Sequence, residues 1–390
     1  MLKIMLSATE VSGDLHGANL VRAIKKICPE CEFLGVGGER MREEGVDVRI
    51  FSTHLGTVGV VEGVKFYPSF LRIISEVKRL LKEEKPDLLV LIDSRDFNLK
   101  LIPLAERLKV PTVYYVAPPV WAWPDWKMKK MSRKINKIIA IFPFEEKIYK
   151  KAGADVVWVG HPLLDVVKPA LDKKEAFKKF SLDPSRPVIG LLPGSREQEI
   201  KALLPLMLKA AENIKKKLKE VQYLLPVASF IFQEKIAKMV EKSKAEVKIL
   251  NDNIYDLMNI SSLLITASGT ATLEAACLGI PMVIVYKTHI TTYLLGKVLL
   301  TLPYVGLPNI LAGRRIVPEL LQFKATEKNL SDTALSLLSH SGRLARMRHE
   351  LKQSVKKLGP PGATERAARV IVEEVKDKGL RSEPGFYSKM

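Results

Sequence analysis

The stretch LLITASGTATLEAACLGIPMVIV, which runs from Leu263 to Val285, contains the pattern that decides the fold. Two short runs of Leu, Ile and Val flank a segment that turns at Gly269, continues as a helix and stops at Gly279-Ile280-Pro281. Short, continuous apolar runs are typical of strands buried on both faces of a parallel sheet. The order strand, helix, strand therefore predicts a βαβ unit with a right-handed crossover.

The same alternation of apolar runs and helical segments extends over most of the chain. It is interrupted where Gly160-His161-Pro162 and Lys168-Pro169 break both periodicities. The sequence therefore predicts an α/β fold of two doubly wound Rossmann-like domains, residues 1–168 and 169–358, followed by residues 359–390 with a frayed end. The expected strands are residues 3–7, 33–36, 88–92, 112–116, 137–141, 156–159, 188–192, 222–226, 247–250, 263–266 and 282–285.

The charge balance restricts the partners without choosing one. The 390 residues include 62 Lys and Arg but only 43 Asp and Glu, a formal net charge of +19 that is dispersed along the chain. Such a field favours nucleic acid, an acidic membrane face or phosphorylated substrates.

The cysteine count and the apolar stretches exclude further classes of protein. Three cysteines cannot form a disulfide scaffold, and Cys28 and Cys31 have no second pair to complete a zinc site, so we expect two thiols at a helix-to-strand turn. No cluster of ligand residues argues for a metal. The residues from Ile290 to Pro308 include a lysine and two prolines, which favours a buried helix and turn over a membrane span. With no signal-peptide pattern, we expect a cytoplasmic protein.

Two turns of the second domain could hold a nucleotide diphosphate. Ser268 and Thr270 flank Gly269 at the start of a helix, whose N–H groups and dipole attract phosphate. Glu274 lies on the same helix face as Thr270, where it could accept hydrogen bonds from two ribose hydroxyls. The other turn, Gly194-Ser195-Arg196, offers backbone N–H groups, a hydroxyl and a guanidinium to a phosphate.

Loops after two strands of the first domain hold further candidates. In the first loop, Gly13 permits close backbone approach and Asp14 is placed to cap the following helix, which suits a tight turn and a substrate loop equally. After the strand at residues 88–92, Asp93 and Asp96 lie three residues apart. Asp93, directly at the strand end, is the better candidate for a general base, whereas a capping role suits Asp96.

Two segments combine apolar or aromatic side chains with basic ones. The segment between Val58 and Lys82 is basic and amphipathic, so it could lie in a bilayer interface, although an ordinary core-facing helix has the same pattern. The segment between Trp121 and Lys134 interleaves tryptophans with basic residues, which suits stacked bases or lipid headgroups. Trp121 and Trp123 also fit aromatic side chains packed beside a solvated helix.

Taken together, several strings resemble the lipid-A-disaccharide synthase family, glycosyltransferases of the GT-B type, in the family's order and over most of the chain. The strings are Ser12-Gly13-Asp14-Leu15-His16-Gly17-Ala18, Ile92-Asp93 with Asp96-Phe97-Asn98, Val120-Trp121-Ala122-Trp123, Phe142-Pro143-Phe144-Glu145, Gly160-His161-Pro162, Leu192-Pro193-Gly194-Ser195-Arg196, Ala267-Ser268-Gly269-Thr270-Ala271 with Leu273-Glu274, and Leu307-Pro308-Asn309-Ile310-Leu311-Ala312-Gly313. The sequence departs from the family at Arg95, where members usually carry proline, and this puts the shape of that loop in question.

The resemblance implies two domains facing each other across a cleft, with a last helix near residues 363–378 returning to the first domain. It implies an inverting transfer, without a cofactor, that joins UDP-2,3-diacylglucosamine to 2,3-diacylglucosamine 1-phosphate (lipid X) and gives the β-1,6-linked lipid A disaccharide 1-phosphate and UDP. Acylated, anionic substrates would explain basic segments that contact an anionic membrane surface, and would place the protein peripherally at the cytoplasmic face of the inner membrane.

The resemblance also assigns roles to the candidate residues. Asp93 is the expected base, Arg196 would neutralise charge on the leaving diphosphate, and Asn309 matches an active-site asparagine, although a turn or cap would explain it comparably well. The residues expected to bind the UDP group are Gly194, Ser195, Ser268, Gly269, Thr270 and Glu274. The residues expected to bind the other substrate are Ser12, Gly13, Asp14, His16, Asp96, Trp121 and Trp123.

Two other functions stay open at this stage. A UDP-N-acetylglucosamine 2-epimerase would share the fold and the nucleotide turn but would need no lipid acceptor. A nucleic-acid-binding protein would suit the net charge and the segment between Trp121 and Lys134, and would bind duplexes with a steep salt dependence. The dispersed charge and a turn shaped for one nucleotide diphosphate argue against nucleic acid.

Overall fold

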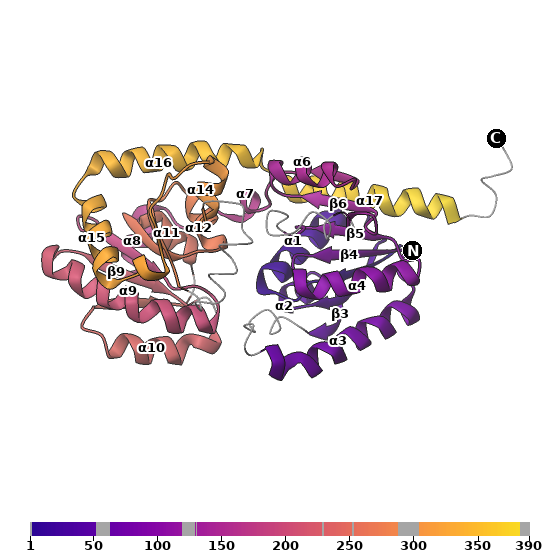
Figure 1. The fold of residues 1–390 in the computed structure, drawn as a ribbon, viewed down its shortest axis with the longest axis horizontal. Helices are drawn as coiled ribbons and strands as arrows, with labels where there is room; N and C mark the ends of the chain where they lie inside the picture. The colour runs from indigo at the N-terminus through magenta and orange to yellow at the C-terminus, as the bar shows by residue number, and fades with distance from the viewer. Residues whose placement is uncertain are drawn as a thin grey trace. The chain divides into compact units, whose positions relative to one another are not determined.

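The computed structural model describes residues 2–51, 63–118, 129, 131–227, 230–251, 253–287 and 304–382 (Figure 1). The chain divides into two compact units: unit 1 contains Met1–Asp165 and Leu358–Met390, and unit 2 contains Val166–Lys357. The sequence predicts the first boundary slightly later, after Lys168. Asp165 belongs with unit 1 because its carboxylate accepts hydrogen bonds from the backbone N–H groups of Gly362 and Thr364.

Unit 1 is built on a parallel sheet with the strand order β3-β2-β1-β4-β5-β6-β7. Its strands are β1 Lys3–Ser7, β2 Glu32–Gly37, β3 Asp47–Phe51, β4 Leu88–Ile92, β5 Thr112–Tyr115, β6 Lys137–Ala140 and β7 Val156–Trp158. Its helices are α1 Val11–Ile27, α2 Glu39–Glu43, α3 Gly63–Glu84, α4 Arg95–Arg107, α6 Pro143–Lys151 and α17 Ala363–Ser382, and α7 Leu163–Val166 lies at its boundary.

Helices cover both faces of the first sheet. On one face, α3 and α4 bury Val77 and Leu101 in the same cluster as Leu91 of β4. On the opposite face α1 approaches very closely, because a Cβ atom on Gly17 would lie 3.3 Å from the side chain of Ile92, the next residue of β4. Consecutive side chains of β4, Leu91 and Ile92, therefore point to opposite faces of the sheet.

The last helix, α17, packs along α1 in unit 1 (Figure 1). The carboxylate of Asp165 caps its first turn, where it also accepts a bond of 3.0 Å from the hydroxyl of Thr364. Further along the helix, Glu374 pairs with Lys137 of β6 at 3.4 Å. The C-terminal segment is thus tied to unit 1 at the start of the helix and again beside the sheet.

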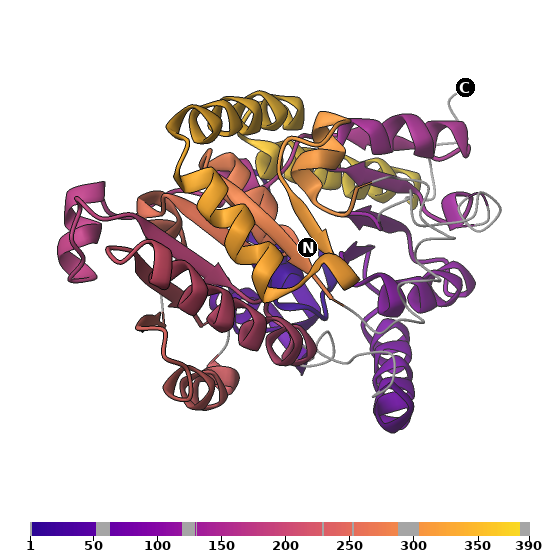
Figure 2. The ribbon, with the colours of Figure 1, turned by 60° about the vertical axis from the view of Figure 1, so that its left-hand side comes forward.

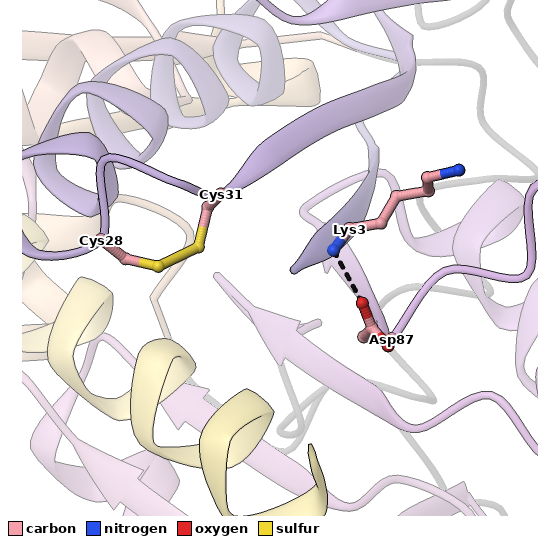
Figure 3. Close-up of a disulfide and its surroundings, with 4 residues drawn as sticks. All are labelled: Lys3, Cys28, Cys31 and Asp87. Atoms are coloured by element: carbon pink, nitrogen blue, oxygen red, sulfur yellow. Dashed lines mark hydrogen bonds between the residues drawn. A yellow bond between two sulfur atoms is a disulfide. The ribbon is translucent and has the colours of Figure 1, made fainter. Parts of the chain in front are cut away.

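A disulfide joins Cys28 to Cys31 where α1 ends and β2 begins (Figure 3). The expectation of two free thiols is wrong, because the turn brings the two Cα atoms to 5.7 Å, a distance that a disulfide spans. Both cysteines are buried. Nearby, the backbone N–H of Lys3 donates a bond of 2.7 Å to Asp87, which ties the start of β1 to that of β4.

Unit 2 contains a second parallel sheet (Figure 2). Its strand order is β10-β9-β8-β11-β12-β13. Its strands are β8 Val188–Leu192, β9 Gln222–Pro226, β10 Val247–Leu250, β11 Leu263–Ala267, β12 Met282–Tyr286 and β13 Glu319–Leu321. Its helices are α8 Lys173–Lys179, α9 Glu197–Lys217, α10 Gln233–Glu241, α11 Ile254–Ile260, α12 Thr270–Cys277, α14 Leu307–Ala312, α15 Glu327–Leu338 and α16 Ser341–Val355. Short 3-10 turns are η3 Phe230–Phe232, η4 Gln322–Lys324 and η5 Lys356–Leu358.

Both sheets have a topological switch point. In unit 1 the strand order reverses between β1 and β4, and in unit 2 it reverses between β8 and β11. Ligands of doubly wound sheets bind beyond the carboxyl ends of the strands at such points. The loops that follow these four strands are therefore the places to look for chemistry.

Candidate active site

Two side chains meet at the switch point of unit 1. Ser12 lies in the first turn of α1, which follows β1, and Asp93 follows β4. The hydroxyl of Ser12 donates a hydrogen bond of 3.0 Å to Oδ2 of Asp93. A carboxylate at this position is suited to accept a proton from a bound hydroxyl.

The backbone at Asp93 has an unusual conformation. Asp93 and Ser94 both have a positive φ, 49° and 46°, in the left-handed region that residues with a Cβ atom rarely adopt. The next residue, Arg95, begins α4. Proline is common at the first position of a helix, so a proline would also fit at the position of Arg95.

Two buried histidines lie in this part of unit 1. His16 lies edge-on to Tyr115, with 6.4 Å between the ring centroids, and burial lowers the pKa of His16 although the nearby Asp93 charge opposes this. Burial, together with the charge of His16, lowers the pKa of His161 to about 3. Nδ1 of His161 accepts a hydrogen bond of 3.2 Å from the backbone of Leu163. Both imidazoles are therefore neutral near pH 7.

Asp14 has a different structural role from the expected one. α1 begins at Val11 with Glu10 as its N-cap, so the prediction that Asp14 caps this helix is wrong. Its buried carboxylate instead accepts bonds from the backbone N–H groups of Gly38 (2.8 Å), Arg40 and Met41 (both 3.1 Å) at the start of α2. A Cβ atom on Gly13 would lie 3.3 Å from the Cβ of Ala8, a tight contact, and at an ordinary 3.5 Å from the carbonyl oxygen of Ile92.

In unit 2, the loop after β8 is shaped by the carboxylate of Glu199, which caps the first turn of α9 as its position in the sequence predicts. Glu199 Oε2 accepts bonds from the backbone N–H groups of Ser195 (3.2 Å) and Arg196 (3.3 Å). A Cβ atom on Gly194, whose φ is 108°, would lie 2.2 Å from the same oxygen, so only glycine allows this approach. Burial raises the pKa of Glu199, opposed by the charge of Arg196. Burial raises the pKa of Tyr286 at the end of β12; the charge of Glu199 adds to this rise and that of Arg196 opposes it.

The turn after β11 opens toward solvent at the start of α12. Gly269 and Thr270 are exposed, and the carbonyl of Gly269 accepts a bond of 2.7 Å from the hydroxyl of Thr272. Four residues after Thr270, Glu274 accepts a bond of 3.2 Å from the hydroxyl of Tyr255, and burial raises its pKa. This turn, the Arg196 loop and Tyr286 all lie at the carboxyl ends of β8, β11 and β12, which are neighbours in the sheet.

Asn309 is enclosed by hydrogen bonds within unit 2. Its Oδ1 accepts bonds from the backbone N–H groups of Ile316 (2.7 Å) and Val317 (2.9 Å). Its Nδ2 donates to the carbonyl of Val317 (3.0 Å) and to Glu319 (2.7 Å). Glu319 also accepts bonds from the backbone of residues 305 and 306. Asn309 therefore shapes the chain around α14.

Ser268 connects that segment to the nucleotide turn. Its hydroxyl donates a bond of 3.2 Å to the carbonyl of Val305, whose own N–H donates to Glu319 at 3.2 Å. The Asn309 network and the Ser268 turn are therefore one connected structure.

Several predicted residues lie outside the described part of the chain. These are Trp121 and Trp123, and the side chain of Asp96. In the basic segment between Val58 and Lys82, the described side chains Phe70, Ile73 and Ile74 pack against the core of unit 1. Only residues 304–308 of the stretch from Ile290 to Pro308 are described, and they lead into α14.

Two kinds of feature are absent from the described residues. None of the helices there is long and apolar enough to cross a bilayer. Nor do these residues include a group of three or more His, Cys, Asp or Glu side chains that could hold a metal ion.

The comparisons with known proteins agree on one family. A sequence model described as Lipid-A-disaccharide synthetase matches residues 4–375. Lipid-A-disaccharide synthase of Geobacter sulfurreducens is 40% identical over 371 residues, which are 95% of this chain and 97% of the relative. That of Syntrophus aciditrophicus is 37% identical over 374 residues, with 96% and 98% covered.

Solved structures show the same fold at low identity. The Staphylococcus aureus MnaA–UDP complex has a TM-score of 0.69 at 13% identity and covers 96% of this chain and 97% of its own. CalG4, the calicheamicin glycosyltransferase, has a TM-score of 0.61 at 14% identity, with 96% and 98% covered. These likenesses concern the fold alone, and they confirm the prediction of two Rossmann-like α/β domains of the GT-B type.

Proposed function

Because the chain belongs to the lipid-A-disaccharide synthase family, and is therefore a glycosyltransferase, we propose that it joins UDP-2,3-diacylglucosamine to 2,3-diacylglucosamine 1-phosphate. The products are UDP and the β-1,6-linked disaccharide 1-phosphate. One structural observation supports the proposal independently of the family. The carboxylate of Asp93 lies at the switch point of unit 1, where its Oδ2 accepts a hydrogen bond of 3.0 Å from the hydroxyl of Ser12.

Asp93 is the proposed general base. It accepts the proton of the acceptor 6-hydroxyl as that oxygen forms a bond to the anomeric carbon of the donor. The bond between the anomeric carbon and the diphosphate oxygen breaks on the opposite face, so UDP leaves and the configuration inverts. His16 and His161 are poorer candidates for this role, since both side chains are buried and Nδ1 of His161 already accepts a hydrogen bond from the backbone of Leu163.

Unit 2 supplies the proposed nucleotide site. The start of α12 at Ser268, Gly269 and Thr270 receives the diphosphate through backbone N–H groups and the helix dipole. Glu274 accepts hydrogen bonds from the ribose, in an arrangement supported by its contact with Tyr255. Arg196 stabilises the negative charge that develops on the leaving UDP. Gly194, Ser195 and Asn309 shape the two loops that carry these groups.

Both proposed substrates are acylated and anionic, so the protein would meet them at a membrane surface. The net charge of +19 supports attraction to anionic lipid headgroups. From Phe70 onward the apolar side of α3 contributes to the core of unit 1, while Arg72 and Arg79 are exposed. The apolar side chains that we propose to contact lipid are therefore those of residues 58–69 and of the segment between Trp121 and Lys134.

Turnover of purified protein in mixed micelles tests the proposal. UDP and disaccharide are measured together, and the anomeric proton coupling of the product gives the stereochemistry. We expect equal amounts of both products, with almost complete loss in Asp93→Asn and Arg196→Ala. Matched controls are Asp47→Asn and Arg186→Ala, exposed residues with ordinary ion pairs, which should retain activity. Release of UDP without disaccharide would contradict the transferase assignment and favour hydrolysis or epimerase-like chemistry.

A further inference from the structure

The turn that carries Asp93 is held in a conformation that its residues disfavour. Asp93 and Ser94 have consecutive positive φ values, and Ser94 has φ 46° and ψ 52°. Neither residue is glycine, so each Cβ atom crowds the backbone. Such residues persist only where the surroundings over-determine them, and they concentrate at functional sites.

Two buried side chains converge on the carbonyl oxygen of Asp93. The hydroxyl of Tyr114, on β5, donates to it at 2.7 Å. Nδ2 of Asn98, on α4, donates to it at 2.9 Å and lies 3.1 Å from the carbonyl of Ile92. Both side chains are fully buried. Water therefore cannot easily replace either donor.

Further bonds fix the direction of these donors. The hydroxyl of Ser7 donates to Oδ1 of Asn98 at 2.7 Å, which assigns the amide nitrogen to the side facing Asp93. The backbone N–H of Thr9 donates to the hydroxyl of Ser94 at 2.9 Å. The turn is therefore held from β1, β5 and α4 at once.

We propose that Tyr114 and Asn98 are positioning residues that hold Asp93 in its left-handed conformation, and with it the direction of its carboxylate toward Ser12. The inference rests on the proposed function of Asp93 as the base. The hydrogen bonds that carry this role go to the backbone carbonyl of Asp93 and not to its carboxylate. Both act through the backbone carbonyl, and the strain in the turn makes that action necessary: without the two donors the chain relaxes to a negative φ and the carboxylate moves.

Tyr114→Phe tests this by removing only the hydroxyl. The matched control is Tyr223→Phe, because Tyr223 is also buried and its hydroxyl donates to the carbonyl of Ala211 at 2.9 Å in unit 2. We expect the two variants to lose similar stability. Only Tyr114→Phe should lose kcat, by ~10- to 100-fold, the range that small displacements of a reacting group produce. KM for the UDP-sugar should stay within about twofold of wild type, since that substrate is bound by unit 2. Equal kcat values in the two variants would overturn the inference.

A second variant tests the other donor independently. Asn98→Asp keeps the size of the side chain but replaces the amide donor by a carboxylate facing two carbonyl oxygens. We expect a larger loss of kcat than in Tyr114→Phe, in protein whose affinity for UDP shows that unit 2 is intact. Wild-type kcat in Asn98→Asp would also overturn the inference.

Crystal structures separate this inference from the proposed function, because they need no turnover. In Tyr114→Phe we expect the φ of Asp93 to change and its carboxylate to move away from Ser12. If the wild type makes no disaccharide but the turn moves in the variant, the proposed function fails and the positioning of Asp93 stands. If the turn is unchanged, the positioning role fails whatever the activity.

Discussion

The hydroxyl of Ser12 and the carboxylate of Asp93, 81 residues apart in sequence, are joined by a hydrogen bond of 3.0 Å. The bond links the first turn of α1 to the end of β4, the two elements that meet where the strand order of unit 1 reverses. It engages one carboxylate oxygen, while general-base catalysis uses the other. Ser12 therefore orients the proposed base from the first turn of α1.

Replacing Ser12 by alanine should lower kcat by about tenfold, because a carboxylate that loses its orienting donor spends less time in the reactive geometry. Steady-state kinetics at saturating donor measure the effect. Ser185→Ala is the matched control, since its hydroxyl also donates to an aspartate, Asp183, at 2.6 Å, but far along the chain in unit 2. A normal kcat in Ser12→Ala, or an equal loss in both variants, would contradict the orienting role.

Glu199 should support UDP binding because its side-chain oxygen holds the backbone of the Arg196 loop, and not because it is negatively charged. In Glu199→Gln the amide oxygen can still accept the bonds from Ser195 and Arg196, and the removal of a negative charge beside the proposed diphosphate site should leave UDP affinity unchanged or higher. Glu199→Ala removes the acceptor, and we expect UDP to bind about five- to tenfold more weakly. Calorimetric titration measures both affinities.

The neighbouring Glu197→Gln is the control for this pair, because Glu197 is paired with Lys201 and Lys235 on the surface. It should bind UDP as the wild type does. Tighter binding in Glu199→Ala would show that the two N–H groups serve the phosphate better when Glu199 is gone.

Asn309→Ala should lower stability as well as activity. It leaves the backbone N–H groups of Ile316 and Val317 without their acceptor, which costs about 2–4 kcal/mol of unfolding free energy for two partly or fully buried donors. Urea unfolding measures the loss. Asn329→Ala, at the exposed start of α15, is the control and should cost less than about 1 kcal/mol. If Asn309→Ala loses activity but keeps full stability, Asn309 acts by contacting the substrate directly and not by holding the backbone.

The sequence predicts strands that read as apolar runs, including β7 and β10 at sheet edges, better than strands whose runs are interrupted or very short. The bounds of β4 and β8 match the prediction because such strands are buried on both faces and read as unbroken apolar runs. β3 and β13 were not predicted, and each lies at the edge of its sheet. In β3, Asp47 and Arg49 interrupt the apolar run, and β13 has only three residues, of which one is Glu319.

The same difference applies to the candidate site. Asp93 and the turn at Ser268 could be located from sequence because each directly follows a recognisable strand. Glu319 and Tyr114 could not, since their roles depend on N–H and carbonyl groups that only the folded chain brings to them. Glu199 could be located in part: its place in the first helical turn after Arg196 predicts a capping role, and the structure has that capping box.

The disulfide predicts a specific thiol count. Protein denatured without reductant should have one reactive thiol, that of Cys277, and reduction should raise the number to three. Alkylation followed by mass spectrometry measures this. Replacing Cys28 and Cys31 by serine should cost about 2 kcal/mol, the value that loop closure gives for so short a loop. Three reactive thiols before reduction would show that the pair is reduced, and Cys277→Ser is the control that should abolish the single thiol.

Glu145 and His161 should give unit 1 opposite dependences of stability on pH. Burial raises the pKa of Glu145 to about 8 and lowers that of His161 to about 3, from ordinary values of 4.5 and 6.5. Between pH 4.5 and 8 the folded state holds a proton on Glu145 that the unfolded state has lost, so this residue makes stability fall as pH rises. Between pH 3 and 6.5 the unfolded state holds a proton on His161 that the folded state lacks, so His161 makes stability rise with pH, and His16 adds to that rise.

In the shared window, pH 4.5 to 6.5, the two contributions therefore oppose each other and single variants should separate them. Glu145→Gln should make the slope of unfolding free energy against pH more positive by about 1.4 kcal/mol per pH unit, and His161→Gln should make it more negative by about the same amount. All four tryptophans belong to unit 1, so urea unfolding followed by tryptophan fluorescence at pH 5 and pH 6 reports this unit. His340→Gln, an exposed histidine, should leave the slope unchanged. Identical slopes in wild type, Glu145→Gln and His161→Gln would mean that neither group keeps its buried protonation state, and the neutral state assigned to the imidazole of His161 would then be wrong.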